Sequence, residues 1–374
     1  MQIKKVLIFC ISLNKGGAER VVSLLLKEYA KDETLEVHFM MMESGIAYDL
    51  PDSIRPIILS HKKKSGLVKL LELPFVAWRV ATYVKEHNIE SVLSFLYRPN
   101  YINILAKFFL TKHRALINIR STTSRYKKEG LLGRVNLFLI RTLFPKADMI
   151  ISNSQGVAED LESLVNVECE TKVIYNPVDM AYIEQQKNLQ PEESSFVFHK
   201  EKKYIISVGR LIPLKRNRDL IDAFFELHKK HKELELIFLG DGPLLEELQE
   251  YTQRLSIEKR VHFLGNVSNP FYYLARSDLF VLNSETEGFP NVLVEAMAVG
   301  IPVISSDCKS GPREILENGK YGELYRVGDV KSLCEKIEHT LYEATEIEQR
   351  VASAYQRMDN FHIEKVMKEY RKIV

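Results

Sequence analysis

Short apolar runs alternate with amphipathic segments along the whole chain. In the first half, the runs that read as buried strands are residues 6–11, 37–42, 91–96, 115–119 and 149–154. Apolar positions at helical spacing between them predict helices over residues 18–31 and 68–86. Strands that alternate with crossover helices are typical of parallel sheets.

The same alternation returns in the second half. Its predicted strands are residues 204–209, 235–240, 261–265, 279–284 and 302–307. From Val330 onward the chain is charged and helical in pattern, and the sequence YNPVD at 175–179 followed by a polar stretch marks a boundary. We therefore expect an α/β protein with two doubly wound, Rossmann-like domains, residues 1–176 and 177–374, facing a central cleft. The helical tail is expected either to stay with the second domain or to cross back to the first.

Length and composition agree with two soluble domains. The chain has 374 residues, 45% hydrophobic and 27% charged, and single cores seldom grow beyond about 250–300 residues. Its apolar runs fall short of the ~18 residues that span a bilayer, and the start MQIKKVLIFC reads as a first strand rather than a signal peptide. The four cysteines are scattered without ligand or disulfide spacing, which indicates a reducing compartment and no structural zinc.

Charge is spread unevenly, although the net charge is only +2. Lys and Arg exceed Asp and Glu before residue 177, and the reverse holds after it. Such an asymmetry suggests nucleic acid, an anionic membrane or an anionic substrate. No nucleic-acid motif is present, so we expect no nucleic acid among the partners.

The most informative segment is NSETEGFPNVLVEAMAVGIPVISSD, which starts at Asn283. Glu287 and Glu295 are separated by seven residues, and Glu287 opens a Glu-Gly-Phe-Pro turn between a strand and a helix. We expect Pro290 in the first helical turn, with the N–H groups of Gly288 and Phe289 near the positive helix end. Amides for a phosphate and carboxylates for hydroxyls suit a sugar nucleotide. The plainer alternative is a strand–helix unit with two surface glutamates.

Two further loops follow predicted strands. Gly16 and Gly17 stand where the first helix is expected to begin, so an anion could rest against the backbone there; the alternative is a tight turn. In VGRLIPLKRN, Arg210 and Lys215 have the chemistry to bind a diphosphate, and the alternative is a pair of solvated loop cations.

Taken together, GGAER, SVGR-x4-K, LGDGP and EGFPNVLVEA resemble the retaining glycosyltransferases of family 4, which have the GT-B fold. The resemblance implies an N-terminal acceptor-binding domain and a C-terminal domain that binds a nucleotide sugar. In this family the residue matching Glu287 lies over the donor sugar and the residue matching Glu295 holds the ribose. The cations matching Arg210 and Lys215 neutralise the diphosphate, and the glycine matching Gly17 approaches it. The resemblance also implies that neither a metal nor a cofactor is needed.

The whole turn, Gly288, Phe289, Pro290 and Asn291, is accordingly expected to contact substrate. Within the family, SFLYRPNYI, FPKADMIISNSQG and KSGPREIL look most like bacterial enzymes that add N-acetylgalactosamine to a polyprenyl-diphosphate-linked glycan. The resemblance thus implies a UDP-sugar donor, carrying N-acetylgalactosamine or another N-acetylhexosamine, and a lipid-linked acceptor in surface or protein glycan assembly.

One position departs from the family pattern. Many members have a histidine after the strand that ends here at Ile119, but this chain has Arg120, Ser121 and Thr122. Arg120 either replaces that histidine, holds the phosphate of the acceptor, or is a surface arginine.

Basic amphipathic segments in the first half suggest a further partner, an anionic membrane surface. Cations cluster at residues 61–64 and mix with apolar residues over 66–86 and 125–146, a pattern that binds anionic lipid. We expect a cytoplasmic protein, peripheral on the inner face of the plasma membrane. The alternative is that these helices only cover the sheet.

Two other functions stay open at this stage. One is a sugar-nucleotide epimerase or hydrolase of the same architecture. The other is a non-catalytic nucleotide-binding scaffold of a membrane complex, against which the four residues Arg210, Lys215, Glu287 and Glu295 argue.

Overall fold

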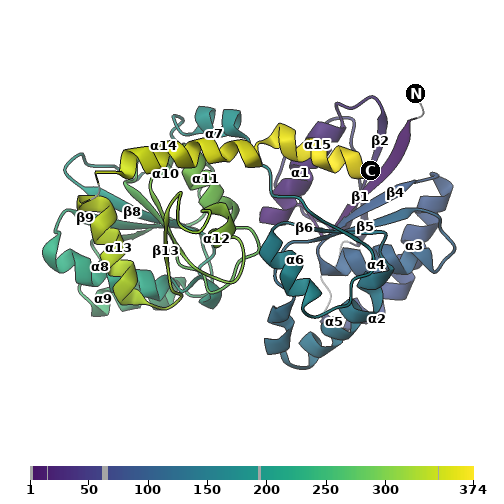
Figure 1. Cartoon of the computed structure of the whole chain (residues 1–374), viewed down its shortest axis with the longest axis horizontal. Coiled ribbons are helices and arrows are strands. Elements are labelled where there is room, and N and C mark those ends of the chain that lie inside the picture. Colours follow the sequence, from purple (N-terminus) through teal and green to yellow (C-terminus); the bar gives the residue numbers. More distant parts are fainter. Residues whose placement is uncertain (1–2, 15, 61–65, 193–194, 344) are drawn as a thin grey trace. The chain divides into compact units, whose positions relative to one another are not determined.

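The computed structural model describes residues 3–14, 16–60, 66–192, 195–343 and 345–374 (Figure 1). The chain divides into two compact units: unit 1 comprises Met1–Pro177 and Glu364–Val374, and unit 2 comprises Val178–Ile363. The boundary thus falls one residue after the one expected from the sequence, and the last helical segment is part of unit 1.

Unit 1 is built on one open sheet. In the described residues its seven strands pair in the order β3-β2-β1-β4-β5-β6-β7, and every pair is parallel. The strands are β1 (Lys4–Cys10), β2 (Leu35–Glu43), β3 (Pro56–Ser60), β4 (Ser91–Phe95), β5 (Arg114–Ile119), β6 (Met149–Ser152) and β7 (Glu170–Val173). Because parallel strands need crossover connections, helices cover both faces of such a sheet.

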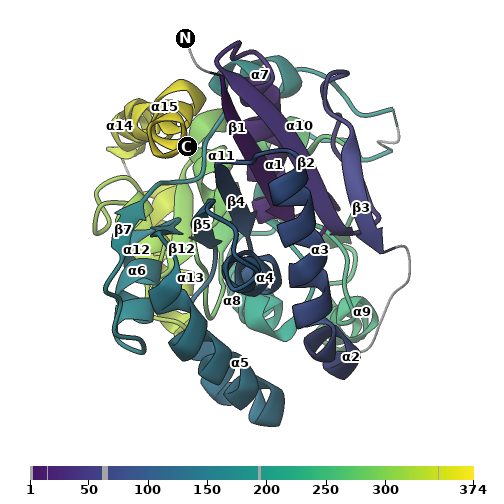
Figure 2. The same ribbon diagram turned by 90° about the vertical axis from the view of Figure 1, so that its right-hand side faces the viewer.

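The crossover segments of unit 1 are mostly helical. They are α1 (Gly17–Tyr29), α2 (Gly66–Leu71), α3 (Leu73–Glu86), α4 (Tyr97–Lys107), η1 (Ser124–Lys128), α5 (Gly130–Leu143), η2 (Phe144–Lys146) and α6 (Gln155–Glu162), and α15 (Ile363–Ile373) joins them from the end of the chain. Leu7, Phe9 and Val92 of the sheet form one core with buried residues of α3, α4 and α5. Figure 2 shows α3 and α4 in front of these strands.

The single helix expected over residues 68–86 is wrong. The structure has two helices, α2 and α3, and the chain turns at Glu72 between them. Pro74 lies in the first turn of α3, where its missing N–H costs nothing, whereas within a continuous helix it would remove a hydrogen bond and clash with the preceding turn.

Unit 2 repeats the same architecture. Six described strands pair in the order β10-β9-β8-β11-β12-β13. They are β8 (Lys203–Val208), β9 (Leu234–Leu239), β10 (Val261–Phe263), β11 (Leu279–Leu282), β12 (Val303–Ser306) and β13 (Glu323–Tyr325). Its helices are α7 (Met180–Gln186), η3 (Pro213–Lys215), α8 (Asn217–Lys230), α9 (Leu245–Arg254), α10 (Pro270–Leu274), α11 (Asn291–Val299), α12 (Pro312–Ile315), α13 (Val330–Tyr342), α14 (Ile347–Arg357) and η4 (Met358–Phe361). Ile205, Leu236, Val281 and Ile304 are buried between the sheet and helices such as α8 and α13.

All ten predicted strands are present, within one or two residues at most ends. The sequence reading missed β3, β7 and β13, which lie at the edges of the two sheets. β7 is half exposed and carries Glu170, Thr171 and Lys172, so it lacks the apolar run of a central strand. None of the described helices combines the length and the apolar content needed to cross a bilayer.

Candidate active site

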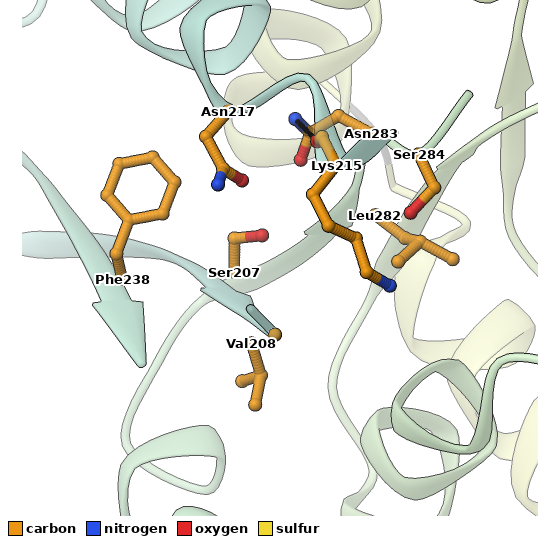
Figure 3. A pocket seen from close by; sticks show the side chains of 9 residues that line it. Ser207, Val208, Lys215, Asn217, Phe238, Leu282, Asn283 and Ser284 are labelled. Carbon is orange, nitrogen blue, oxygen red and sulfur yellow. Dashed lines mark hydrogen bonds between the residues drawn. The ribbon is translucent and has the colours of Figure 1, made fainter. Parts of the chain in front are cut away.

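The strand order of unit 2 reverses at β8, which pairs with β9 on one side and β11 on the other. Open α/β sheets bind ligands outside the carboxyl ends of the strands at such a switch point. A small hollow lies at this position. Figure 3 shows its lining, which comprises Ser207, Val208, Gly209, Lys215, Asn217, Phe238, Leu282, Asn283 and Ser284.

Lys215 and Glu287 form an ion pair beside this hollow. The Lys215 ammonium lies 2.6 Å from Oε1 of Glu287. The two side chains are 23% and 15% exposed, so both remain within reach of a ligand. The structure therefore brings together two residues that are 72 positions apart in the sequence and that were singled out from two separate motifs.

The Glu287 carboxylate is held by a second donor. The hydroxyl of Ser284, a fully buried residue at the end of β11, donates to the same oxygen, Oε1, at 2.6 Å. Ser310 supports the main chain of the turn by donating to the Glu287 carbonyl at 2.5 Å. Both charge-assisted bonds fall on Oε1, so this oxygen anchors the side chain.

Lys215 is positioned through its backbone. It ends the short helix η3, and the Asn283 amide donates to its carbonyl at 2.5 Å. The next residues add a main-chain bond from Glu285 N–H to the Leu214 carbonyl at 2.8 Å. The backbone of the loop after β8 is thus fixed to the segment that follows β11.

Arg210 follows β8 in a loop shaped by glycines. Gly209 donates to the Leu239 carbonyl at 2.8 Å, and a Cβ at Gly240, where φ is +129°, would lie 2.1 Å from the Gly209 carbonyl. These glycines therefore permit two loops to touch through their backbones, and LGDGP serves this packing. Arg210 itself is exposed, and its guanidinium forms no ion pair within the described ranges.

Glu295 projects from α11, which begins at Asn291 and ends at Val299, with Gly300 as its C-cap. It is the fifth residue of this helix, about a turn and a half from Pro290, as the sequence pattern predicts. Its side chain is only 9% exposed. Asn291 is half-buried at the helix start.

The turn before α11 is packed rather than open. Pro290 is the residue just before the helix, one position earlier than expected. Gly288 is buried, and the Phe289 ring, 6% exposed, packs edge-on against Phe361 at 5.4 Å. A Cβ at Gly311, where φ is +90°, would come within 2.9 Å of the Gly288 carbonyl, so this glycine lets the KSGP loop support the turn.

Cys308 is buried close to the Lys215–Glu287 pair, and its thiol is kept protonated there. Desolvation, reinforced by the Glu287 carboxylate and opposed by Lys215, raises the pKa of Cys308 to about 12. Cys308 is therefore a neutral thiol at physiological pH, and only a thiolate would be an effective nucleophile.

In unit 1, Gly16 and Gly17 stand at the start of α1, whose first residue is Gly17. The Gly16 N–H donates to the Tyr48 hydroxyl at 3.3 Å, and that hydroxyl donates to the Gly16 carbonyl at 3.2 Å. The glycine pair thus marks a helix N-terminus as expected, and its contact with a diphosphate stays a prediction.

Arg120 follows β5 and is not a surface residue, because its side chain is only 8% exposed. Its guanidinium donates to the Tyr370 hydroxyl at 3.3 Å and to Asn176. Phe95 lies under the cation, 5.8 Å from ring centroid to Cζ. Desolvation lowers the pKa of Arg120 below its ordinary value. The bond to Tyr370 connects α15 to the rest of unit 1, and a role of Arg120 toward the acceptor stays a prediction.

Metal ligands do not gather in the described part of the chain: no group of three or more His, Cys, Asp or Glu side chains is close enough to hold an ion. Metal independence itself stays a prediction.

Sequence reasoning missed the polar residues that support the site. Asn217, Asn283, Ser284 and Ser310 became visible only in the fold. Asn217, Asn283 and Ser284 lie within five residues of Lys215 or Glu287 in the sequence. This proximity was the signal that could have identified them.

Comparison with known proteins agrees with this geometry. The model of "Glycosyltransferase Family 4" matches residues 15–182, and that of "Glycosyl transferases group 1" matches residues 190–357. A Campylobacter jejuni protein, N-acetylgalactosamine-N,N'-diacetylbacillosaminyl-diphospho-undecaprenol 4-alpha-N-acetylgalactosaminyltransferase, is 36% identical over 344 residues, covering 91% of this chain and 90% of the relative. The chain belongs to glycosyltransferase family 4.

Two further likenesses bear on this glycosyltransferase. A second C. jejuni enzyme, GalNAc-alpha-(1->4)-GalNAc-alpha-(1->3)-diNAcBac-PP-undecaprenol alpha-1,4-N-acetyl-D-galactosaminyltransferase, is 27% identical and covers 99% of this chain and 98% of its own. The crystal structure of Anabaena Alr3699/HepE in complex with UDP and glucose superposes with a TM-score of 0.78 at 22% identity, over 99% of both chains. The structural likeness shows the fold, which is GT-B.

Proposed function

We propose that this glycosyltransferase transfers N-acetylgalactosamine or another N-acetylhexosamine from a UDP-sugar to a polyprenyl-diphosphate-linked glycan, with retention of the anomeric configuration. The names of the two C. jejuni relatives support this acceptor and this sugar. The observation that carries the proposal is the Lys215–Glu287 pair at the switch point of unit 2, 2.6 Å from ammonium to carboxylate.

In this proposal the charge of the leaving diphosphate is balanced by fixed cations. Lys215 and Arg210 stabilise the negative charge that grows on UDP as the bond from the anomeric carbon to the phosphate oxygen breaks. The acceptor hydroxyl forms the new bond on the same face, and its proton goes to the departing phosphate oxygen. The half-buried Glu287 orients the sugar hydroxyls and supplies negative potential to the oxocarbenium-like sugar. Glu295 holds the ribose.

Since cations and helix termini supply this stabilisation, we propose that no metal is required. The test is turnover in EDTA, which should match turnover without chelator. Activity that disappears in EDTA and returns with Mg²⁺ or Mn²⁺ would overturn the mechanism.

We further propose that unit 1 rests on an anionic membrane surface at the cytoplasmic face. Large apolar side chains of α2, α3 and α5 are exposed, namely Leu71 (74%), Phe75 (60%), Trp78 (51%), Leu131 (76%) and Phe138 (65%). The exposed cations Arg79, Lys85 and Arg134 stand on the same helices. Apolar and basic side chains together favour the interface of anionic lipid. The basic run at residues 61–64 lies outside the described residues.

The membrane proposal has a direct test. Sedimentation with vesicles of phosphatidylglycerol should carry the protein down, vesicles of phosphatidylcholine should carry down less, and Phe75→Ser with Trp78→Ser should weaken both. If the wild type ignores anionic vesicles, or if the double variant only abolishes self-association, the face binds something else.

Function itself is tested by a donor screen. The enzyme is incubated with UDP-N-acetylgalactosamine, UDP-N-acetylglucosamine, UDP-galactose and UDP-glucose, each with a lipid-linked acceptor extract, and products are weighed by mass spectrometry. We expect one N-acetylhexosamine added to the lipid-linked glycan. UDP release in the absence of acceptor would favour a hydrolase. Conversion of the donor sugar into another sugar would favour an epimerase, and tight donor binding without turnover would favour a scaffold.

A further inference from the structure

Asn217 is a buried polar residue with an unsatisfied donor at the switch-point hollow. It is the first residue of α8, is 4% exposed and lines the hollow. In the described part of the chain, its Nδ2 has no hydrogen-bond partner. Figure 3 shows its amide pointing into the hollow toward Ser207, between Phe238 and Lys215.

An unsatisfied buried donor destabilises a folded protein, because the amide gives up water and gains no partner. Another buried asparagine of unit 2 shows the ordinary arrangement. Asn269, 7% exposed, donates to the carbonyls of Gln186 and Leu189, both at 2.7 Å, and accepts from Phe271. Asn217 differs from it in having a donor left for a group that enters the hollow.

The surroundings of Asn217 favour an anionic oxygen. Lys215, two residues earlier, provides a positive charge at the same hollow. The N-terminus of α8, a helix of 14 residues, adds a positive partial charge at the position of Asn217. The neighbouring Arg216 is paired with Asp219 at 2.7 Å, so its guanidinium does not compete with Asn217 for an anionic oxygen in the hollow.

We propose that Asn217 donates its amide to a diphosphate oxygen of the nucleotide, next to Lys215. This inference rests on the proposed use of a nucleoside diphosphate donor and adds a binding residue to that site. It also implies a separation of effects: the amide lowers the stability of the free protein and raises its affinity for the anion.

The test measures stability and binding in the same variants. Asn217→Ala should leave the melting temperature of the free protein unchanged or raise it, and should weaken UDP about tenfold or more, the loss of one hydrogen bond to a charged group. Asn217→Asp should weaken UDP further, about 100-fold, because a carboxylate would face the anion. Uridine, titrated by the same calorimetry, should bind all variants alike.

Asn269→Ala is the matched control, since it should lower the melting temperature and keep UDP affinity. Equal losses of uridine and UDP affinity in Asn217→Ala would assign the amide to the base instead, and unchanged UDP affinity would remove it from the site. Titration with inorganic pyrophosphate tests the contact with the diphosphate in the absence of a base. If the wild type binds pyrophosphate through Asn217 but does not bind UDP, the proposed UDP donor is wrong, and only the contact of Asn217 with a diphosphate is supported.

Discussion

The ion pair between Lys215 and Glu287 makes a specific prediction about Glu287→Gln. In the free protein, Glu287 holds the ammonium at 2.6 Å, so a diphosphate that binds Lys215 must compete with this carboxylate. The amide of glutamine keeps the size of the side chain and removes its charge. UDP affinity should therefore stay the same or increase, while turnover should fall because the negative potential at the sugar is lost.

The expected magnitude follows from the exposure of the pair. Exposed ion pairs contribute about 0.2–1 kcal/mol, and hydrogen bonds to charged groups about 1.5–3 kcal/mol. With side chains that are 23% and 15% exposed, about 1 kcal/mol is reasonable, which corresponds to UDP bound up to about fivefold more tightly. The turnover number should fall about 100-fold or more, the usual effect of removing one electrostatic contact to a transition state.

Calorimetric titration of UDP and steady-state rates are measured on the same preparations. Lys215→Ala should weaken UDP and lower turnover, and Glu287→Gln should no longer change UDP affinity when Lys215 is absent. Glu258→Gln, at an exposed position of unit 2, serves as the control. The reasoning is refuted if Glu287→Gln weakens UDP binding or if it leaves turnover intact.

Three further results are expected. Arg210→Ala should lower the turnover number about 100-fold with little change in melting temperature, because its side chain is exposed; near-normal turnover would exclude it from the site. Glu295→Gln should weaken UDP and donor binding together by about 1–3 kcal/mol in titrations, since ribose is bound alike in substrate and transition state; intact affinity would contradict its role. Burial lowers the pKa of His113 to about 4, below the 6.5 of the unfolded chain, so the unfolded state takes up the proton first and stability decreases as pH falls from about 6.5 to 4. By that linkage, His113 should contribute a loss of about 2.5 kcal/mol of unfolding free energy between pH 7 and 4.5, and His113→Gln should lose less than the wild type in urea titrations; equal losses would show that another group titrates.

The central strands could be predicted because burial on both faces requires continuous apolar runs, as in β9, whose six residues are buried. Three of the four edge strands were missed, whereas β10, also at an edge, was predicted. β7 carries polar residues because one of its sides has no neighbouring strand, and β3 and β13 are only 5 and 3 residues long. The break at Glu72 was foreseeable from Pro74, but the apolar periodicity continues across it and conceals the turn.

The motif residues of the site were accessible to sequence reasoning because phosphate and sugar chemistry restricts which residue types can serve. Their neighbours were not. Ser284 and Ser310 are ordinary residues whose importance comes from where the Glu287 carboxylate and carbonyl lie. Arg120 was singled out from the sequence, but its contact was not predictable. Its partner Tyr370 is 250 positions away, and no local pattern indicates that the two residues meet.

The return of Glu364–Val374 to unit 1 has a consequence for the order of synthesis. Tyr370, which is fully buried, accepts a bond from Arg120 and donates one to Asn118 at 3.0 Å. A ribosome releases the whole of unit 2 before it releases this tyrosine. During translation Arg120 and Asn118 of unit 1 therefore have no Tyr370 hydroxyl to bind until unit 2 has been synthesised. All residues of unit 2 are already present at that point. Unit 2 is therefore complete first, and unit 1 is completed only when Glu364–Val374 has followed unit 2 out of the ribosome.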